Sequence, residues 1–128
     1  MRRDLDSAAD VGVLAVSDLI YLASPYSHTD RAVVEARFDA VCVEAAILMA
    51  AGHHIFSPIA HTHPIAMRGE LPTDWTFWQQ YDTAMIRACS ALWVLMLDGW
   101  DTSKGVAAEM AIATELGIPV IYIEPRRP

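Results

Sequence analysis

The chain has 128 residues, of which 54% are hydrophobic, and it carries a formal net charge of -7 with a pI of about 5.0. This length and composition suit one domain with a real core, and they exclude a disordered chain. The acidic balance argues against a nucleic-acid polymer as partner, because a polymer backbone attracts a basic face. A nucleotide monomer remains possible.

Neither a disulfide framework nor a membrane span is indicated. The two cysteines, Cys42 and Cys89, stand among apolar neighbours, and we interpret both as reduced core thiols. No apolar run approaches the roughly 18–20 residues of a transmembrane helix, and the N-terminus lacks the unbroken apolar stretch of a signal peptide. We expect a cytoplasmic protein with no membrane partner, in which residues 1–16 form a poorly ordered extension and residues 17–128 one domain.

From residue 18 onward the sequence alternates between strand and helix patterns. Residues 19–23 predict a first strand, and the apolar stripe of residues 30–51 predicts a long helix that Gly52 ends. A short second strand follows at 54–56. Residues 58–73, rich in proline and glycine, are predicted to be a long loop of the kind that often binds a ligand or forms a lid.

The second half continues the alternation. Its predicted elements are a helix over 74–89 with Thr73 or Asp74 as N-cap, a buried strand over 91–97, a loop over 98–102, a helix over 104–116 capped by Ser103 and closed by Gly117, and a strand over 118–123.

This pattern predicts an α/β fold in three layers, flavodoxin-like or Rossmann-like, with a parallel sheet of strand order 2-1-3-4 and helices on both faces. In such sheets a ligand lies beyond the carboxyl ends of the strands, where the strand order reverses. Here that place lies between the first and third strands. The residues it nominates for substrate binding are Ser24, Pro25, Tyr26, Asp98, Trp100, Ser103 and Gly105.

Two acidic residues interrupt the apolar faces of predicted helices. At about 100° per residue, Glu109 falls on the side of its helix that carries Ala113. Asp82 falls between Trp78 and Ile86 in the apolar stripe of helix 74–89. An unpaired charge in such a place costs several kcal/mol. Each acid therefore needs a partner, a raised pKa or an adjoining pocket, and an active site provides the pocket.

A structural role for the two acids is the alternative. Either acid can pair with Arg31, Arg37 or Arg87. One anomalous acid fits a structural role and a functional site equally well. Two such acids, on the helices that flank the third strand, favour a functional site.

The chain resembles the nucleoside 2-deoxyribosyltransferase superfamily over residues 18–125. That group includes the transferases, the deoxynucleoside 5'-monophosphate N-glycosidases and small related proteins of unknown function, and this chain is most similar to the last. The motifs that carry the resemblance are the strand with Tyr21, the stretch from Asp82 to Ile86 before an apolar strand, and the spacing Ser103-x-Gly105-x-x-x-Glu109.

The resemblance implies a role for each matching position. Glu109 matches the nucleophile, Asp82 the acid that transfers a proton at the base, and Tyr21 a tyrosine that orients the nucleophile. Ser103 matches a serine that contacts phosphate in the monophosphate-cleaving branch. The resemblance implies no cofactor. It does imply a homodimer or a higher homo-oligomer. The loop with Pro25 departs from the Gly-Ser pair of that branch, and proline supplies no N–H for a phosphate.

Together these observations predict cleavage or transfer of the N-glycosidic bond of a nucleoside or nucleoside 5'-monophosphate, through a Glu109 nucleophile and a protonated Asp82. His61 or His63, both in the loop over 58–73, is a further candidate for contact with the base or phosphate. Trp100 is the favoured aromatic side chain for stacking on the base, while Trp75 and Trp78 are expected in the core.

Other functions were weighed against this one. A non-catalytic protein that binds a nucleotide or a sugar phosphate is the main alternative, since the fold and a helix N-terminus would serve it equally. A metal site built on His61 and His63 is disfavoured, because neither has a nearby cysteine and both fall in the loop. A flavodoxin-type electron carrier is disfavoured, because no phosphate loop rich in serine and threonine follows the first strand.

Overall fold

The computed structural model describes residues 18–126, so the predicted extension at 1–16 lies outside the described residues. In chain order the elements are β1 (Leu19–Ala23), α1 (Arg31–Ala50), β2 (His54–Phe56), α2 (Pro58–Gly69), α3 (Trp75–Arg87), β3 (Ala91–Leu95), the short 3-10 helix η2 (Trp100–Thr102), α4 (Lys104–Glu115) and β4 (Val120–Ile123).

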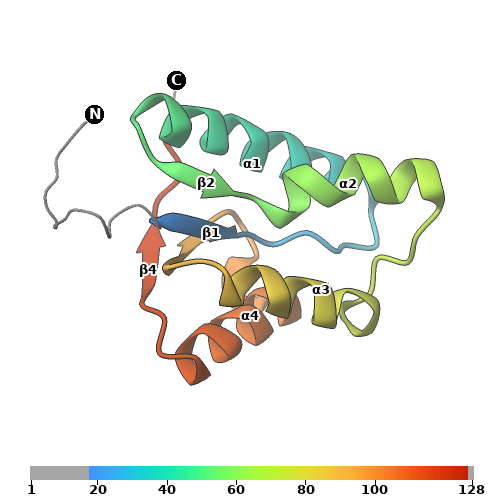
Figure 1. Ribbon diagram of the computed structural model, residues 1–128. Helices are drawn as coiled ribbons and strands as arrows, with labels where there is room; N and C mark the ends of the chain where they lie inside the picture. Colours follow the sequence, from blue (N-terminus) through green and yellow to red (C-terminus); the bar gives the residue numbers. More distant parts are fainter. Residues whose placement is uncertain (1–17, 127–128) are drawn as a thin grey trace, which may run out of the picture.

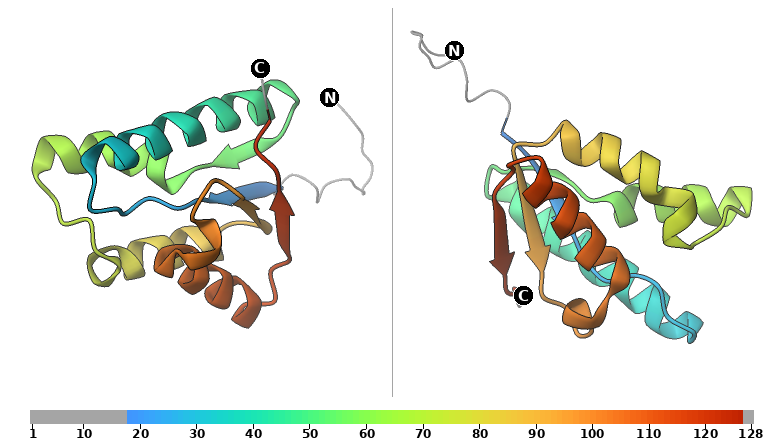
Figure 2. Two further views of the ribbon diagram at one scale, coloured as in Figure 1. Left: turned by 180° about the vertical axis from the view of Figure 1, so that it is seen from behind. Right: turned by 90° about the horizontal axis from the view of Figure 1, so that it is seen from below.

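The four strands form one parallel sheet in the order β2-β1-β3-β4, which confirms the predicted topology. Helices α1 and α2 cover one face of the sheet, and α3 and α4 cover the other (Figure 1). The two views of Figure 2 show the same three layers, with β4 at one edge. The strand order reverses between β1 and β3, as expected for a fold that binds ligands at this point.

The core has two halves, one on each face of the sheet, because successive side chains of a strand point to opposite faces. In β1, Ile20 and Leu22 pack into the half beneath α1. Tyr21 and Ala23 pack into the half that α3 and α4 cover. The alternation in this one strand therefore aims Tyr21 at the two helices that carry Asp82 and Glu109.

The loop predicted over 58–73 is wrong in its first part, because residues 58–69 form helix α2. Ser57 caps this helix, its Oγ accepting a hydrogen bond from the amide of Ala60 at 3.1 Å. Pro58 takes the first helical position, where a missing N–H costs nothing. Pro64 lies inside the helix, and packing outweighs its penalty because His63 and Ala66 are buried.

Two strands are shorter than predicted. β3 ends at Leu95, because the amide of Leu97 turns back to the carbonyl of Leu95 at 2.8 Å. β4 starts at Val120, because the amide of Ile118 closes α4 on the carbonyl of Ala113 at 2.8 Å and Pro119 has no amide hydrogen. The helices differ from their predicted bounds by one or two residues.

Among the helices of residues 18–126, none combines the length with the apolar character that crossing a lipid bilayer requires.

Glu70 ends α2 in the left-handed conformation, with φ 54° and ψ 43°. A side chain raises the energy of this conformation, whereas glycine adopts it freely. Glu70→Gly is therefore expected to raise the free energy of unfolding by about 0.5–1 kcal/mol, measured by urea denaturation. The matched control Glu115→Gly, at a right-handed helical position of α4, should lower it by about 1 kcal/mol. An unchanged or lower stability of Glu70→Gly would contradict this account of the helix end.

Candidate active site

A cavity of about 450 Å³ opens beyond the carboxyl ends of β1 and β3, at the predicted place. Its wall is made by the loop after β1, by Arg37 of α1, by the N-terminal part of α2, by α3 and the residues just before it, and by the segment from Gly99 into α4. This volume is in the range of pockets that bind small molecules. The fold therefore provides a cavity large enough for a small molecule at the topological switch point.

Both anomalous acids line this cavity, Asp82 from α3 and Glu109 from α4. Asp82 is 8% exposed and Glu109 is 6% exposed, so their predicted burial on apolar helix faces is confirmed. The two helices pack against each other. Val106 and Ala113, one turn to either side of Glu109, are fully buried in the core beneath.

Tyr21 supplies the hydrogen bond that holds Glu109. Its hydroxyl donates to Oε2 of Glu109 over 2.6 Å, and the ring is fully buried. Burial, followed by the negative charge of Glu109, raises the pKa of Tyr21 well above its ordinary value, so the phenol remains a donor. The sequence gives no sign of this contact, since the two partners are 88 positions apart.

No arginine neutralises either acid within residues 18–126, which disfavours the purely structural alternative. Arg31 pairs with Glu35 at 3.2 Å. Arg37 instead donates to two main-chain carbonyls, those of Ser27 at 2.9 Å and Asp98 at 3.3 Å.

The two carboxyl groups titrate as a pair. Burial raises the pKa of Glu109, the Tyr21 hydrogen bond opposes the rise and the neighbouring Asp82 adds to it, so that the pKa is about 8. Burial also raises the pKa of Asp82, and the neighbouring Glu109 and Tyr21 oppose that rise, so that the pKa is about 6. Between these values the pair holds one proton. The sequence predicts that proton on Asp82; the deeper burial of Glu109 places it first on Glu109.

The start of α4 forms a second polar part of the wall. Ser103 caps the helix, its Oγ accepting from the amide of Val106 at 3.2 Å, and Ser103, Lys104 and Gly105 all line the cavity. Opposite them the hydroxyl of Ser24 is buried and has no hydrogen-bond partner among the described residues. A helix N-terminus and a free hydroxyl together suit an anionic or hydroxyl group of a ligand.

The remaining predicted site residues divide into two groups. Tyr26 lines the cavity, with its hydroxyl 2.6 Å from Nδ1 of His63. The structure does not bring Pro25, Asp98, Trp100 or His61 to the cavity wall.

A physical reason separates each of these four from the cavity. Pro25 is buried and Asp98 faces solvent. Trp100 packs on the core beside Tyr122, with ring centroids 5.5 Å apart. His61 is exposed on α2, because the residues expected to form a loop are helical and turn His63, not His61, inward.

Several cavity residues have no role in the sequence-based site. Trp75 and Trp78, expected in the core, are half-buried and line the cavity, and Arg37 and Thr62 line it as well. The indole of Trp78 is held by a 2.7 Å hydrogen bond to the carbonyl of Pro72. The apolar stripe of α3 predicted an inward direction for these tryptophans, but it did not distinguish a core from a cavity wall.

No group of three or more metal-ligating side chains comes together in the part of the chain that the structure describes.

A family model described as "Domain of unknown function (DUF1937)" matches residues 18–124. The chain belongs to this family. Among solved structures, this DUF1937 chain is similar to a 2-deoxyribosyltransferase from the psychrotolerant bacterium Bacillus psychrosaccharolyticus, a biocatalyst for the synthesis of antiviral and antitumoral nucleosides. The identity is 26% and the TM-score 0.56, over 86% of this chain and 74% of that one. A search of curated proteins finds no match. The family and the structural likeness confirm the resemblance to the nucleoside 2-deoxyribosyltransferase superfamily.

Burial of Glu109 makes a prediction about stability. Because its folded-state pKa of about 8 lies above its ordinary value of 4.5, the stabilising contribution is complete below pH 4.5 and is lost as pH rises to about 8. The Glu109→Gln variant has no carboxyl group to ionise, so it avoids this loss of stability, and its amide oxygen can still accept the hydrogen bond from Tyr21. Its unfolding free energy should exceed that of the wild type by at least about 1 kcal/mol at pH 9, since one pKa unit is about 1.4 kcal/mol.

The advantage should shrink steadily between pH 8 and pH 5, as measured by thermal and urea denaturation. Glu115→Gln, at an exposed position on the same helix, is the matched control and should follow the wild type at every pH. A Glu109→Gln curve parallel to the wild type would show that the Glu109 carboxyl titrates normally.

Proposed function

We propose that this protein is an enzyme that cleaves or transfers the N-glycosidic bond of a nucleoside or nucleoside 5'-monophosphate, with Glu109 as nucleophile. The observation that carries the proposal is the pair Asp82 and Glu109, buried, without a cationic partner among the described residues, and open to a shared cavity. The similarity to a 2-deoxyribosyltransferase supports the same general chemistry. A protein that only binds a nucleotide would gain nothing from two carboxyl groups in this place.

In the first step, a carboxylate oxygen of Glu109 bonds to the anomeric carbon as the bond to the base nitrogen breaks. The bonding electron pair leaves with the base, which takes a proton from Asp82. The pair must then have its single proton on Asp82. Asp82 and Glu109 are neighbours in the cavity wall, so the proton can pass from Glu109 to Asp82, and the Tyr21 hydroxyl stabilises the Glu109 anion that results.

In the second step, water or a second base attacks the anomeric carbon and releases the Glu109 carboxylate. The ionised Asp82 takes the proton of the attacking group, so the pair ends with one proton as it began. Two displacements at the same carbon give net retention of configuration. Water as acceptor gives hydrolysis, and a second base gives transfer.

The rest of the cavity fits the parts of such a substrate. Trp75 and Trp78 offer aromatic faces to a base. A 5'-phosphate has a seat at the start of α4, near Ser103 and Gly105, with the hydroxyl of Ser24 as a further donor. Pro25 does not weaken this seat, because it is not part of the cavity wall.

Substitution of the two acids separates their roles. Glu109→Ala should lower kcat by at least about a thousandfold with every substrate, because it removes the nucleophile. Asp82→Asn should lower kcat by about 10²–10⁴-fold with natural nucleosides, but far less with a 4-nitrophenyl 2-deoxyriboside, whose leaving group needs no proton. Base or nitrophenol release is measured by chromatography and absorbance.

Glu115→Gln serves as the control for an acid on the same helix outside the cavity. Equal turnover by Glu109→Ala and the wild type would refute the nucleophile. A ligand-induced rise in Tm without turnover of any substrate would favour the binding protein over the enzyme.

The shared proton predicts a bell-shaped pH dependence of kcat/KM. Below about pH 6 both carboxyls are protonated and the nucleophile is lost, while above about pH 8 both are ionised and the acid is lost. Activity should therefore be highest between these values. In Asp82→Asn the alkaline fall should vanish, because no acid remains to be lost. A wild-type profile that stays flat from pH 5 to pH 9 would contradict the shared proton.

A further inference from the structure

A second group of polar side chains, from the loop after β1 and from α1 and α2, meets the cavity wall and takes no part in the proposed glycosyl step. Tyr26 lines the cavity from the loop after β1, and its hydroxyl lies 2.6 Å from Nδ1 of His63 in α2. The other ring nitrogen of His63, Nε2, lies 3.2 Å from Oε2 of Glu35 in α1. Three residues from separate elements thus form the chain Glu35–His63–Tyr26.

The middle member of this chain is fixed in orientation. His63 is 5% exposed, and its ring lies against the ring of Phe38 with centroids 4.2 Å apart. The ring of Tyr26 meets it edge-on, with centroids 5.6 Å apart and planes at 78°. Both ring nitrogens have polar partners, as a buried imidazole requires.

The contact with Glu35 favours one tautomer of His63. The Glu35 carboxylate can only accept, and its Oε2 lies 3.2 Å from Nε2 of His63, which favours the tautomer with its hydrogen on Nε2. Arg31 donates to the same carboxylate oxygen. In a neutral imidazole the opposite nitrogen, Nδ1, then holds a lone pair. The hydroxyl of Tyr26 consequently donates its hydrogen to Nδ1. Its hydrogen points away from the cavity, and its oxygen lone pairs remain for a ligand.

We propose that Tyr26 determines ligand specificity by accepting a hydrogen bond from an O–H or N–H group of the bound nucleoside. The hydroxyl of an ordinary tyrosine can donate or accept a hydrogen bond, but the hydrogen of the Tyr26 hydroxyl is already donated to His63. Tyr26 therefore favours a ligand donor and disfavours a carbonyl or phosphate oxygen at this part of the wall. Only the identity of the ligand as a nucleoside rests on the proposed function.

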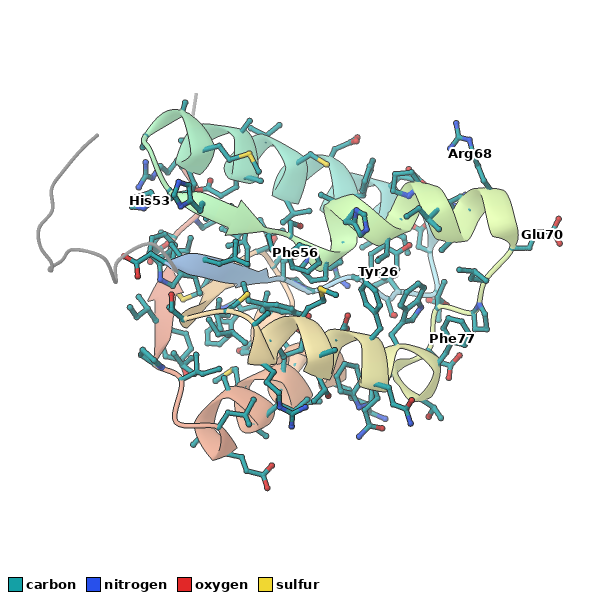
Figure 3. The ribbon with its side chains drawn as sticks, viewed as in Figure 1. Tyr26, His53, Phe56, Arg68, Glu70 and Phe77 are labelled. Carbon is teal, nitrogen blue, oxygen red and sulfur yellow. The ribbon has the colours of Figure 1, made fainter. Side chains whose placement is uncertain are left out.

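The location of Tyr26 suits contact with a ligand. Figure 3 shows its side chain in the space between α2 and α3, while Phe77 lies farther out along α3. The donor on the ligand has two possible sources, an amino group of the base or a hydroxyl group of the sugar. Both have the same chemistry, and paired ligand analogues distinguish them.

The first test is the tautomer of His63, which needs no substrate. Nitrogen-15 NMR of the wild type should show Nε2 as the protonated nitrogen and Nδ1 as the unprotonated one near neutral pH. A hydrogen on Nδ1 would make Tyr26 a donor toward the cavity and would overturn the proposal.

The second test measures binding by calorimetry in a Glu109→Gln background, so that ligands are not turned over. The ligands are 2′-deoxyadenosine and 2′-deoxycytidine, each beside analogues that lack the base amino group or one sugar hydroxyl. One missing donor should weaken binding by about three- to tenfold, the range of a single neutral hydrogen bond. With Tyr26→Phe added, the parent and that analogue should bind within about twofold of each other. Tyr122→Phe, at an exposed position on β4, is the matched control and should keep the discrimination.

The outcomes separate this inference from the proposed function. Loss of the discrimination in Tyr26→Phe alone supports it, and the sensitive analogue identifies the base or the sugar as the source. Tight binding with discrimination unchanged in Tyr26→Phe overturns the inference and leaves the proposed function standing. Failure of every nucleoside to bind overturns the proposed function, and with it the assignment of a nucleoside to Tyr26.

Discussion

The hydrogen bond from Tyr21 to Glu109 is the interaction on which the candidate site depends. It joins β1 to α4 over 2.6 Å and gives the buried carboxyl group of Glu109 a polar partner in an otherwise apolar core. Because Asp82 shares the same burial, the two acids hold a proton between them at neutral pH rather than two full charges. The site is thus a local compromise in stability, of the kind expected where function opposes packing.

The fold brings this pair to the cavity by simple means. Strand alternation turns Tyr21 toward α3 and α4, and the reversal of strand order opens a space above the ends of β1 and β3. The helix N-terminus of α4 lines that space, and Glu35, the buried His63 and Tyr26 approach it from the layer of α1 and α2. Residues from the end of β1, from α1 and α2, and from α3 and α4 therefore all line one cavity.

Much of this was predictable from the sequence, because periodicity reports burial directly. The strand order, the caps Ser103 and Asp74, and the burial of Asp82 and Glu109 follow from local patterns. Helix α2 was not predictable from its prolines and glycine, since tertiary packing decided its conformation. The same error left no way to decide between His61, which is exposed, and His63, which is buried. Contacts between distant residues, such as Arg37 with two loop carbonyls, leave no pattern in the sequence.

The two hydrogen bonds of Arg37 limit how the rim of the cavity can vary. Arg37 donates only to main-chain oxygens, so its hold on the two loops does not depend on which side chains stand at Ser27 and Asp98. Gly99 is different, because its φ of 92° suits glycine and any β-carbon would collide with the guanidinium of Arg37. A side chain at Gly99 would therefore displace the guanidinium of Arg37 from its place, which would weaken the link between the two loops and let the rim of the cavity move.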